Sequence, residues 1–305
     1  MRPSAIESPV LPAAHPRTST NPVISLLDLV LREVSSWFDT TLQAAQGRAG
    51  HAELIVFFAI LAAGTVLRFW GLGEVGLHGD EKTMALPMMH LLTQGTPLMP
   101  SGMFYPRAIP QLYLMAGSVE IFGQSEWAMR VPSALCGVLL IALAYFVGRR
   151  FLTAPWNLAF AAAVAFLPDF IMSSQMARMY IFFITCVAAF LLFLFKWERT
   201  DRTGYLVGAV IVLGVGMTFH TLTIFSAPLL FYPGLVQGDR RKTLLGLVAF
   251  VLVAAGFLAM DAWIGSAYPD TVPVDGAEPL RKGAKAAAAI PHFTPLLLAA
   301  AAAAE

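Results

Sequence analysis

The chain has 305 residues, of which 57% are hydrophobic and only 13% are charged, and its formal net charge is +1. A soluble domain carries about 25% charged residues, so the composition argues against a soluble enzyme and a disordered protein. A near-neutral chain also lacks the basic surface of a nucleic-acid binder. Cys136 and Cys186 both lie in apolar runs and indicate no disulfide framework. We therefore predict an all-α polytopic membrane protein.

The first 50 residues are predicted to lie on the cytoplasmic side of the membrane. Residues 1–22 are rich in Pro, Ser and Ala, so we expect disorder there, and they lack the apolar core of a signal peptide. Residues 23–45 place apolar side chains at helical spacing, which predicts an amphipathic helix on the inner leaflet. The alternative interpretation is a soluble coil that precedes the first span.

Seven apolar segments follow between residues 51 and 265, and most are close to the roughly 20 residues that a membrane helix needs. The sequence therefore predicts about seven transmembrane helices, at residues 53–70, 132–149, 155–172, 180–197, 204–220, 222–237 and 243–264. Residues 266–305 are expected to form an external or low-complexity C-terminal segment, first polar and then rich in alanine.

The distribution of Lys and Arg in the short loops predicts the orientation. Three short turns hold eight cations, which are Arg149, Arg150, Lys196, Arg199, Arg202, Arg240, Arg241 and Lys242. These turns and the N-terminus are predicted to be cytoplasmic, and the long loop 73–131 external. Residues 109–122 are apolar but too short for an ordinary span, which favours an interfacial or re-entrant segment. If they did span, every later loop would change sides.

This topology brings polar residues from three distant parts of the chain to the external rim. The residues are His78, Asp80, Glu81, Lys82, Arg107, Glu120, Glu126 and Arg130 from the first loop, then Asp169, Arg178 and Tyr180, and then His220. The convergence of carboxylates and guanidinium groups beside the membrane predicts a site at this rim.

Adjacent carboxylates at Asp80 and Glu81 are costly above a bilayer unless they are solvated, paired or coordinated. They could equally begin a helix over 81–92, with Asp80 as its N-cap. An external Arg178 at the start of a span needs an anion, and its planar fork suits a phosphate or a carboxylate. It could instead reach lipid headgroups or pair with Asp169. His220 is either a packing residue or, with His78 and the two carboxylates, a metal ligand.

Four stretches of the sequence match a known pattern in combination. They are RFWGLG leading to LHGDE, FYPRAIPQLYL, FGQSEWAMRVPS and LPDFIMSSQMARMY. Together they resemble the GT-C superfamily of glycosyltransferases, in particular the bacterial relatives of protein O-mannosyltransferases and of the lipid A aminoarabinose transferase. Arg107 stands where these proteins have Lys, and Ala108 where they have Pro. The likeness covers residues 65–200 well, and residues 200–265 by topology alone.

The resemblance implies a GT-C-like membrane module over residues 51–265, which transfers a sugar from a polyprenyl phosphate in the outer leaflet. Carried over by motif, Asp80 is the candidate base or acceptor-orienting carboxylate, and Glu81 is its partner or a metal-facing carboxylate. Arg107 and Arg178 would hold the lipid phosphate. Arg130 would belong to the same phosphate-binding set and support the loop. The supporting residues would be His78, Tyr180, Asp169 and His220.

A direct displacement at such a site would invert the anomeric centre. No cofactor is firmly implied, although a divalent cation is compatible with the acidic pair. The expected partners are a polyprenyl-phosphate sugar, membrane lipids and an acceptor that is a protein, lipid or glycan. Partner membrane subunits are compatible with the resemblance, and nucleic acid is not expected. The expected location is the bacterial inner membrane, with the active face periplasmic or extracellular.

Two other functions are open at this point. A catalytically silent subunit could keep the fold and serve as a scaffold in a membrane complex, which the short chain favours because relatives continue further. A lipid transporter or flippase is less favoured, because transporters show internal repeats and polar helix breaks near mid-membrane. Here the charges gather at one rim.

Overall fold

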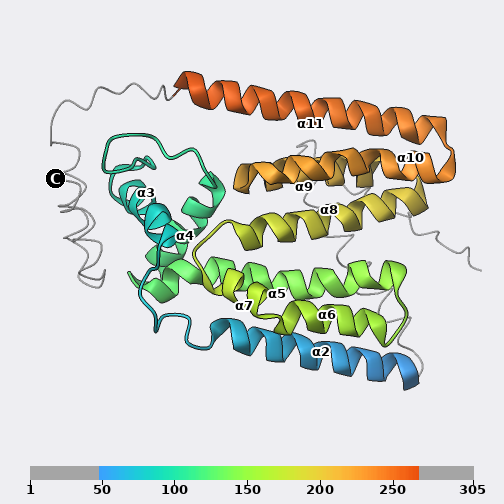
Figure 1. Ribbon diagram of the computed structural model, residues 1–305, viewed down its shortest axis with the longest axis horizontal. Coiled ribbons are helices and arrows are strands. Elements are labelled where there is room, and N and C mark those ends of the chain that lie inside the picture. Colours follow the sequence, from blue (N-terminus) through green and yellow to red (C-terminus); the bar gives the residue numbers. More distant parts are fainter. Residues whose placement is uncertain (1–47, 268–305) are drawn as a thin grey trace, which may run out of the picture. The chain divides into compact units, whose positions relative to one another are not determined.

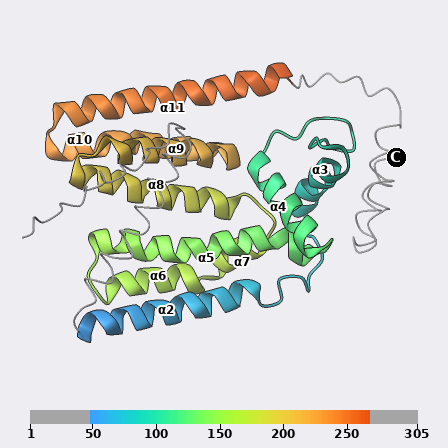
Figure 2. The same ribbon diagram turned by 180° about the vertical axis from the view of Figure 1, so that it is seen from behind.

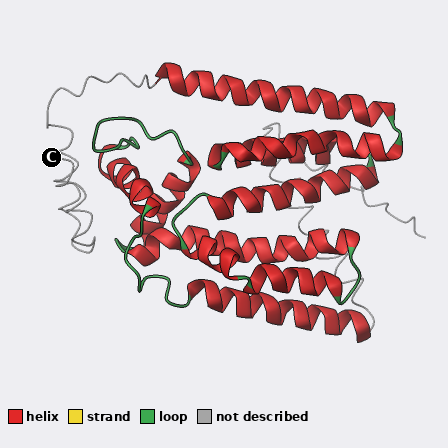
Figure 3. Cartoon of the chain, viewed as in Figure 1, coloured by secondary structure: helices red, strands yellow, loops and turns green. Residues whose placement is uncertain are grey.

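The computed structural model describes residues 48–267, and every regular element in this part of the chain is a helix (Figure 3). An isolated antiparallel bridge joins Leu98 to Phe104 in the loop between α3 and α4. The predictions made for the N-terminal tail, the amphipathic helix and the alanine-rich end lie outside the described residues.

Two sets of helices make up the described chain (Figure 1). The first set runs side by side, and its members are α2 (Arg48–Phe69), α5 (Glu126–Phe151), α6 (Trp156–Phe166), α7 (Pro168–Gln175), α8 (Tyr180–Thr200), α9 (Thr203–Phe219), the 3₁₀ helix η1 (Thr221–Phe231), α10 (Tyr232–Gln237) and α11 (Arg240–Ala267). The second set is α3 (Asp80–Gln94) and α4 (Ile109–Phe122), which lie together at one end of the bundle.

Four helices are long and apolar enough to cross a membrane, and their qualifying segments are Gly50–Phe69, Glu126–Phe151, Tyr180–Thr200 and Arg240–Met260. The bent pair α6–α7 makes a fifth if it counts as one span, while Thr203–Phe219 and Thr221–Gln237 are shorter apolar stretches. An all-α polytopic membrane protein is therefore confirmed. All seven predicted segments are helical, but length and composition qualify four or five of them as spans.

The third predicted segment is broken where a single helix was expected. The axes of α6 and α7 differ by 50°, and Pro168 begins α7. Proline has no N–H and its ring crowds the preceding turn, so it ends α6. The carbonyls of Val164 and Ala165 receive the guanidinium of Arg68 instead, at 2.9 and 3.1 Å. The expected sixth span is likewise not one α-helix, because η1 contains Pro228 and α10 starts only at Tyr232.

The turns that hold the cationic residues lie at the end of the bundle away from α3 and α4 (Figures 1 and 2). At that end Arg150 pairs with Glu198 at 3.0 Å, and Lys242 pairs with Asp201. Helix α4 lies with α3 at the end of the bundle where α5 and α8 begin, and it is not among the candidate spans. This placement agrees with the prediction that residues 109–122 form an interfacial or re-entrant segment and not an ordinary span.

Apolar packing fixes α3 and α4 against the bundle. Met84 and Met88 of α3 and Leu112 and Met115 of α4 are fully buried, in the same cluster as Met129 of α5. Burial of a large apolar side chain contributes about 1.5–3 kcal/mol relative to exposure to water. This packing holds the two short helices against α5. It also fixes the position of the beginning of α3 relative to α5.

Candidate active site

The candidate site forms around the beginning of α3. Gly79 precedes the helix with φ +45°, a left-handed value that glycine adopts without strain, and no side chain caps the helix start. Asp80 is already the first helical residue, so the expected role of Asp80 as N-cap is wrong. Glu81 reaches back instead, and its Oε2 accepts the backbone N–H of His78 at 3.0 Å.

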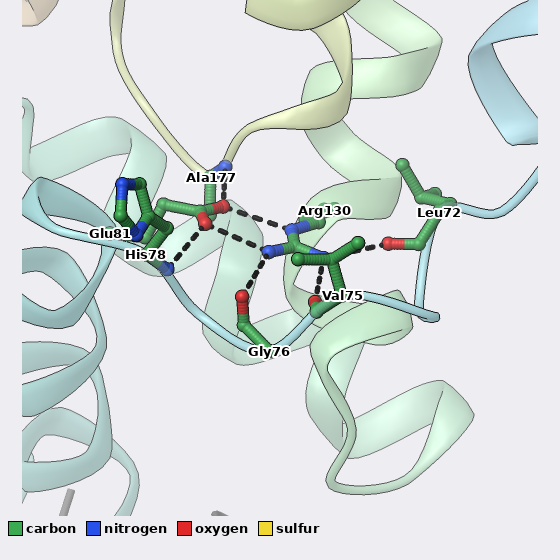
Figure 4. Close-up of polar contacts among 7 residues, drawn as sticks. All are labelled: Leu72, Val75, Gly76, His78, Glu81, Arg130 and Ala177. Carbon is green, nitrogen blue, oxygen red and sulfur yellow. Dashed lines mark hydrogen bonds and ion pairs between the residues drawn. The ribbon is translucent and has the colours of Figure 1, made fainter. Parts of the chain in front are cut away.

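Glu81 forms a two-pronged ion pair with Arg130 of α5 (Figure 4). Nε of Arg130 donates to Oε1 at 2.9 Å, and Nη2 donates to Oε2 at 2.8 Å. The hydroxyl of Ser125 accepts the N–H of Ala128 and so starts α5 one turn before Arg130. Only 1% of the Glu81 side chain and 6% of the Arg130 side chain are exposed. Both charges are therefore inside the protein.

The same pair ties together four segments of the chain. The remaining N–H groups of Arg130 donate to the carbonyls of Leu72, Val75 and Gly76, at 2.9, 2.6 and 3.3 Å, in the loop that follows α2. Oε1 of Glu81 also accepts the N–H of Ala177, at 2.7 Å, from the loop between α7 and α8. The α2–α3 loop, α3, α5 and the α7–α8 loop thus meet at one carboxylate, which we name the Glu81–Arg130 knot.

The hydrogen bonds of this knot decide the charge state of Glu81. Burial by itself raises the pKa of the carboxyl, because a charge is poorly solvated in the interior. The hydrogen bonds from Arg130 and from the N–H groups of Ala177 and His78 outweigh burial and bring the pKa below its ordinary value. Glu81 is therefore an anion, and both of its carboxylate oxygens accept hydrogen bonds from protein donors.

Asp80 lies in a different environment, one residue earlier. Its Oδ2 is 3.0 Å from Nη2 of Arg178, and 69% of its side chain is exposed, whereas only 8% of the Arg178 side chain is. Nη1 of Arg178 donates to the backbone carbonyl of Asp80 at 3.0 Å and lies 3.4 Å from Oγ1 of Thr83. The alternative pairing of Arg178 with Asp169 is therefore wrong in this structure.

The buried Nε of Arg178 has no hydrogen-bond partner among residues 48–267. Its guanidinium lies over the ring of Tyr180, 5.4 Å from the ring centre, and Nη2 is 3.4 Å from the Tyr180 hydroxyl. A guanidinium held in place by the protein, with donor capacity left over, is suited to an incoming anion. We name Asp80, Arg178 and Tyr180 the open pair region.

Of the other predicted site residues, His220 and His78 lie close to the open pair region or the knot, and Asp169 pairs with neither Arg178 nor Glu81. The ring of His220 lies 5.8 Å from that of Tyr180, and the charges of both Arg107 and Arg178 act on it, so the open pair region extends to the α9–η1 turn. His78 contributes its backbone N–H to the knot. Asp169 is exposed in the first turn of α7, at the helix break, and forms no hydrogen bond or ion pair with Arg178 or Glu81 in the described part of the chain.

Metal binding finds no support in the described part of the chain. Residues 48–267 contain no group of three His, Cys, Asp or Glu side chains arranged to hold a metal ion. His78 and His220, which we expected as candidate ligands, form no such group with the carboxylates. The carboxylate of Glu81 is in any case occupied by Arg130 and two backbone amides.

Arg68 is a polar residue that sequence reasoning did not single out. It is fully buried, and Nε donates to Oγ of Ser174 at 3.1 Å in addition to the carbonyls at the helix break. A Cβ at Gly137 would lie 2.7 Å from Nε, so only glycine leaves room for it. The available signal was an arginine at the end of an apolar run, without an acidic residue one helical turn away.

Comparison with solved structures defines the class of the protein. ArnT from Cupriavidus metallidurans in the apo state is 18% identical, with a TM-score of 0.57 over 84% of this chain and 54% of ArnT. The apo oligosaccharyltransferase of Archaeoglobus fulgidus is 19% identical, with a TM-score of 0.56 over 83% of this chain and 32% of that enzyme. Both are GT-C glycosyltransferases, and this chain has the GT-C fold.

A second structure of ArnT, bound to undecaprenyl phosphate, is 20% identical, with a TM-score of 0.53 over 84% of this chain and 54% of ArnT. The family model for dolichyl-phosphate-mannose-protein mannosyltransferase matches residues 107–264, and the chain belongs to this family. No curated protein sequence matched the chain. The chain spans about half the length of ArnT.

Proposed function

We propose that the protein is a membrane glycosyltransferase that moves a sugar from a polyprenyl phosphate to an acceptor hydroxyl. The observation that carries this proposal is the open pair, in which an exposed carboxylate lies 3.0 Å from a buried guanidinium. Transfer from a phospholipid donor needs a base for the acceptor proton and a cation for the departing phosphate. Asp80 and Arg178 supply these two groups side by side.

The proposed step is a single displacement at the anomeric carbon. Asp80 takes the proton from the acceptor hydroxyl, the acceptor oxygen bonds to the anomeric carbon, and the bond from that carbon to the phosphate oxygen breaks. The electron pair leaves with the phosphate, where Arg178 and the exposed Arg107 stabilise it. Because attack and departure occur on opposite faces of the sugar, the configuration inverts.

Donor binding and base activation are linked in this arrangement. In this structure the carboxylate of Asp80 is the ion-pair partner of Arg178, at 3.0 Å. A lipid phosphate that binds to Arg178 competes with Asp80 and frees its oxygen for the acceptor. The structure of ArnT with undecaprenyl phosphate supports a polyprenyl lipid as the donor class.

We infer that the Glu81–Arg130 knot positions the reacting groups and does not itself react. Its carboxylate is 1% exposed and bonded on both oxygens, so no substrate proton or metal can reach it without breaking the knot. The hydrogen bond from Ala177 to Glu81 fixes the residue before Arg178. Glu81 directly follows Asp80, so the knot also fixes the backbone next to Asp80. We therefore assign Glu81 and Arg130 to positioning, in place of the metal-facing and phosphate-binding roles.

Replacement of Asp80 by Asn tests the proposal. Asn cannot accept the proton, so transfer from membrane-extracted polyprenyl-phosphate sugars should fall by about 10²–10⁴-fold. Glu120→Gln, an exposed carboxamide substitution in α4, is the matched control and should keep wild-type activity. If Asp80→Asn transfers sugar at the wild-type rate, the base assignment fails. If the wild type transfers no sugar, but a membrane complex fails to assemble without the protein, the result would favour the silent scaffold.

We also propose that the end of the bundle with α3 and α4 faces the periplasm or the exterior of a bacterial inner membrane. The eight cations of the opposite turns support this orientation, since such residues are enriched on the cytoplasmic side. Single cysteines at positions 80 and 149 in a chain without Cys136 and Cys186 test it. A membrane-impermeant maleimide should label position 80 in sealed cells and position 149 only after lysis; the reverse pattern would invert the topology.

A further inference from the structure

His220 carries an inference that follows from the way its ring is bonded. It lies in the turn between α9 and η1, and its Nδ1 accepts the backbone N–H of Leu222 at 3.1 Å, which caps η1. A backbone amide only donates, so Nδ1 carries no proton, and the neutral ring must carry its proton on Nε2. The capping bond thus fixes the tautomer and makes Nε2 a hydrogen-bond donor.

The Nε2–H group of His220 is available to donate a hydrogen bond to a ligand. No residue in the described part of the chain forms a hydrogen bond with it. The ring is held by Tyr180 and Phe183, with ring centres at 5.8 and 5.4 Å, and Tyr180 is itself covered by Arg178 at 5.4 Å. A fixed donor therefore lies on the same aromatic platform as the guanidinium of the open pair.

The charges around His220 suit a neutral donor. Burial lowers the pKa of His220, and the positive charges of Arg107 and Arg178 lower it further, so the ring stays neutral at physiological pH. Tyr180, which is itself titratable, packs against the ring with ring centres 5.8 Å apart. A neutral imidazole adds a donor to this positive site without adding the repulsion of a third cation.

We propose that His220 is a third donor to the anion at this site, with Nε2–H bonding a phosphate oxygen of the polyprenyl phosphate that Arg107 and Arg178 hold. This inference rests on the proposed function and adds a contact from the α9–η1 turn. The three donors come from the loops before α4 and α8 and from this turn, so they approach the phosphate from three separate segments. That arrangement fixes the orientation of the phosphate as well as its charge.

Two substitutions separate the cap from the donor. In His220→Asn the amide oxygen takes the place of Nδ1 and can still accept the N–H of Leu222, but no donor reaches the position of Nε2. In His220→Gln the longer amide places an N–H close to the position of Nε2. The first variant therefore keeps the structural bond and loses the proposed ligand bond, and the second restores the ligand bond.

Binding of undecaprenyl phosphate and of the uncharged undecaprenol to the purified full chain in detergent is the measurement. His220→Asn should bind undecaprenyl phosphate about tenfold more weakly, as expected for one lost hydrogen bond to a charged group. Its affinity for undecaprenol and its melting temperature should stay those of the wild type. His220→Gln should bind the phosphate within about threefold of the wild type.

The outcomes distinguish the two proposals. If the wild type binds undecaprenyl phosphate and His220→Asn binds it equally well, or loses both lipids equally, the role of His220 is refuted while the donor assignment stands. If the wild type binds undecaprenyl phosphate no better than undecaprenol, the proposed function itself fails. Should His220→Asn be unstable, the ¹⁵N resonance of Nε2 in the wild type gives the answer: it should shift with undecaprenyl phosphate and not with undecaprenol.

Discussion

The Glu81–Arg130 knot and the open pair of Asp80 with Arg178 begin at adjacent residues, yet they differ in almost every physical respect. In the knot both side chains are buried, and the carboxylate accepts four hydrogen bonds. In the open pair the carboxylate is 69% exposed and a single ion pair joins the side chains. One pair holds segments together, and the other can exchange its partner for a substrate.

The difference arises from the geometry of a helix start. Successive residues of an α-helix point about 100° apart, so Glu81 turns toward α5 and the α7–α8 loop while Asp80 stays at the surface. A buried charge must be paired and fully hydrogen-bonded, whereas an exposed one is stabilised by water. Environment, rather than residue type, therefore separates a positioning carboxylate from a reactive one.

The largest expected effect comes from breaking the knot. Glu81→Ala leaves the guanidinium of Arg130 buried without its carboxylate, which should lower the free energy of unfolding by about 3–5 kcal/mol. Asp80→Ala is the matched variant one residue away and should cost about 1 kcal/mol, because water screens the exposed carboxylate and Arg178 keeps its hydrogen bond to the backbone carbonyl of residue 80. Chemical denaturation in detergent measures both, and equal losses would remove the distinction between the two pairs.

The dependence of stability on pH provides a second test of Glu81. Because the folded protein lowers the pKa of Glu81, the ionised form stabilises the fold. This stabilisation is fully present above the unfolded pKa of about 4.3, and it is lost as the pH falls through the lower folded pKa. The melting temperature of the wild type should therefore drop below about pH 4, and Glu81→Gln should lack this component.

A smaller effect is expected when the open pair is broken from its basic side. Arg178→Ala should weaken undecaprenyl phosphate binding by about 10–100-fold, the value of a hydrogen bond to a charged group, and should leave undecaprenol binding unchanged. Arg178→Lys keeps the charge but loses the planar fork, so its affinity should lie between those of the wild type and the Ala variant.

Arg149→Ala is the control for this measurement, because it removes a partly exposed arginine at the opposite end of the bundle, 4.0 Å from Glu53. It should leave the affinity for both lipids unchanged. An Arg178→Ala variant that loses the two lipids equally would show that Arg178 supports packing and does not bind phosphate.

The sequence by itself determined the class of the protein and the approximate course of its helices. Hydropathy is a local property, so an apolar run reports a membrane helix wherever the run lies. The sequence also showed the three cationic turns, from which the orientation was predicted, because each turn lies between two consecutive apolar segments. Chemistry and position alone identified Asp80 and Arg178 as candidates, since charged groups beside a membrane need solvent, a partner or a ligand.

Only the tertiary structure decided which acid pairs with which arginine. Glu81 and Arg130 are 49 residues apart, and Arg178 is 98 residues from the carbonyl it binds, so no local pattern joins them. The helix break at Pro168 and the burial of Arg68 also depend on neighbours that approach from other helices. Pairing and burial are set by distance and packing in space, and these determine whether a carboxylate becomes a structural anchor or an available base.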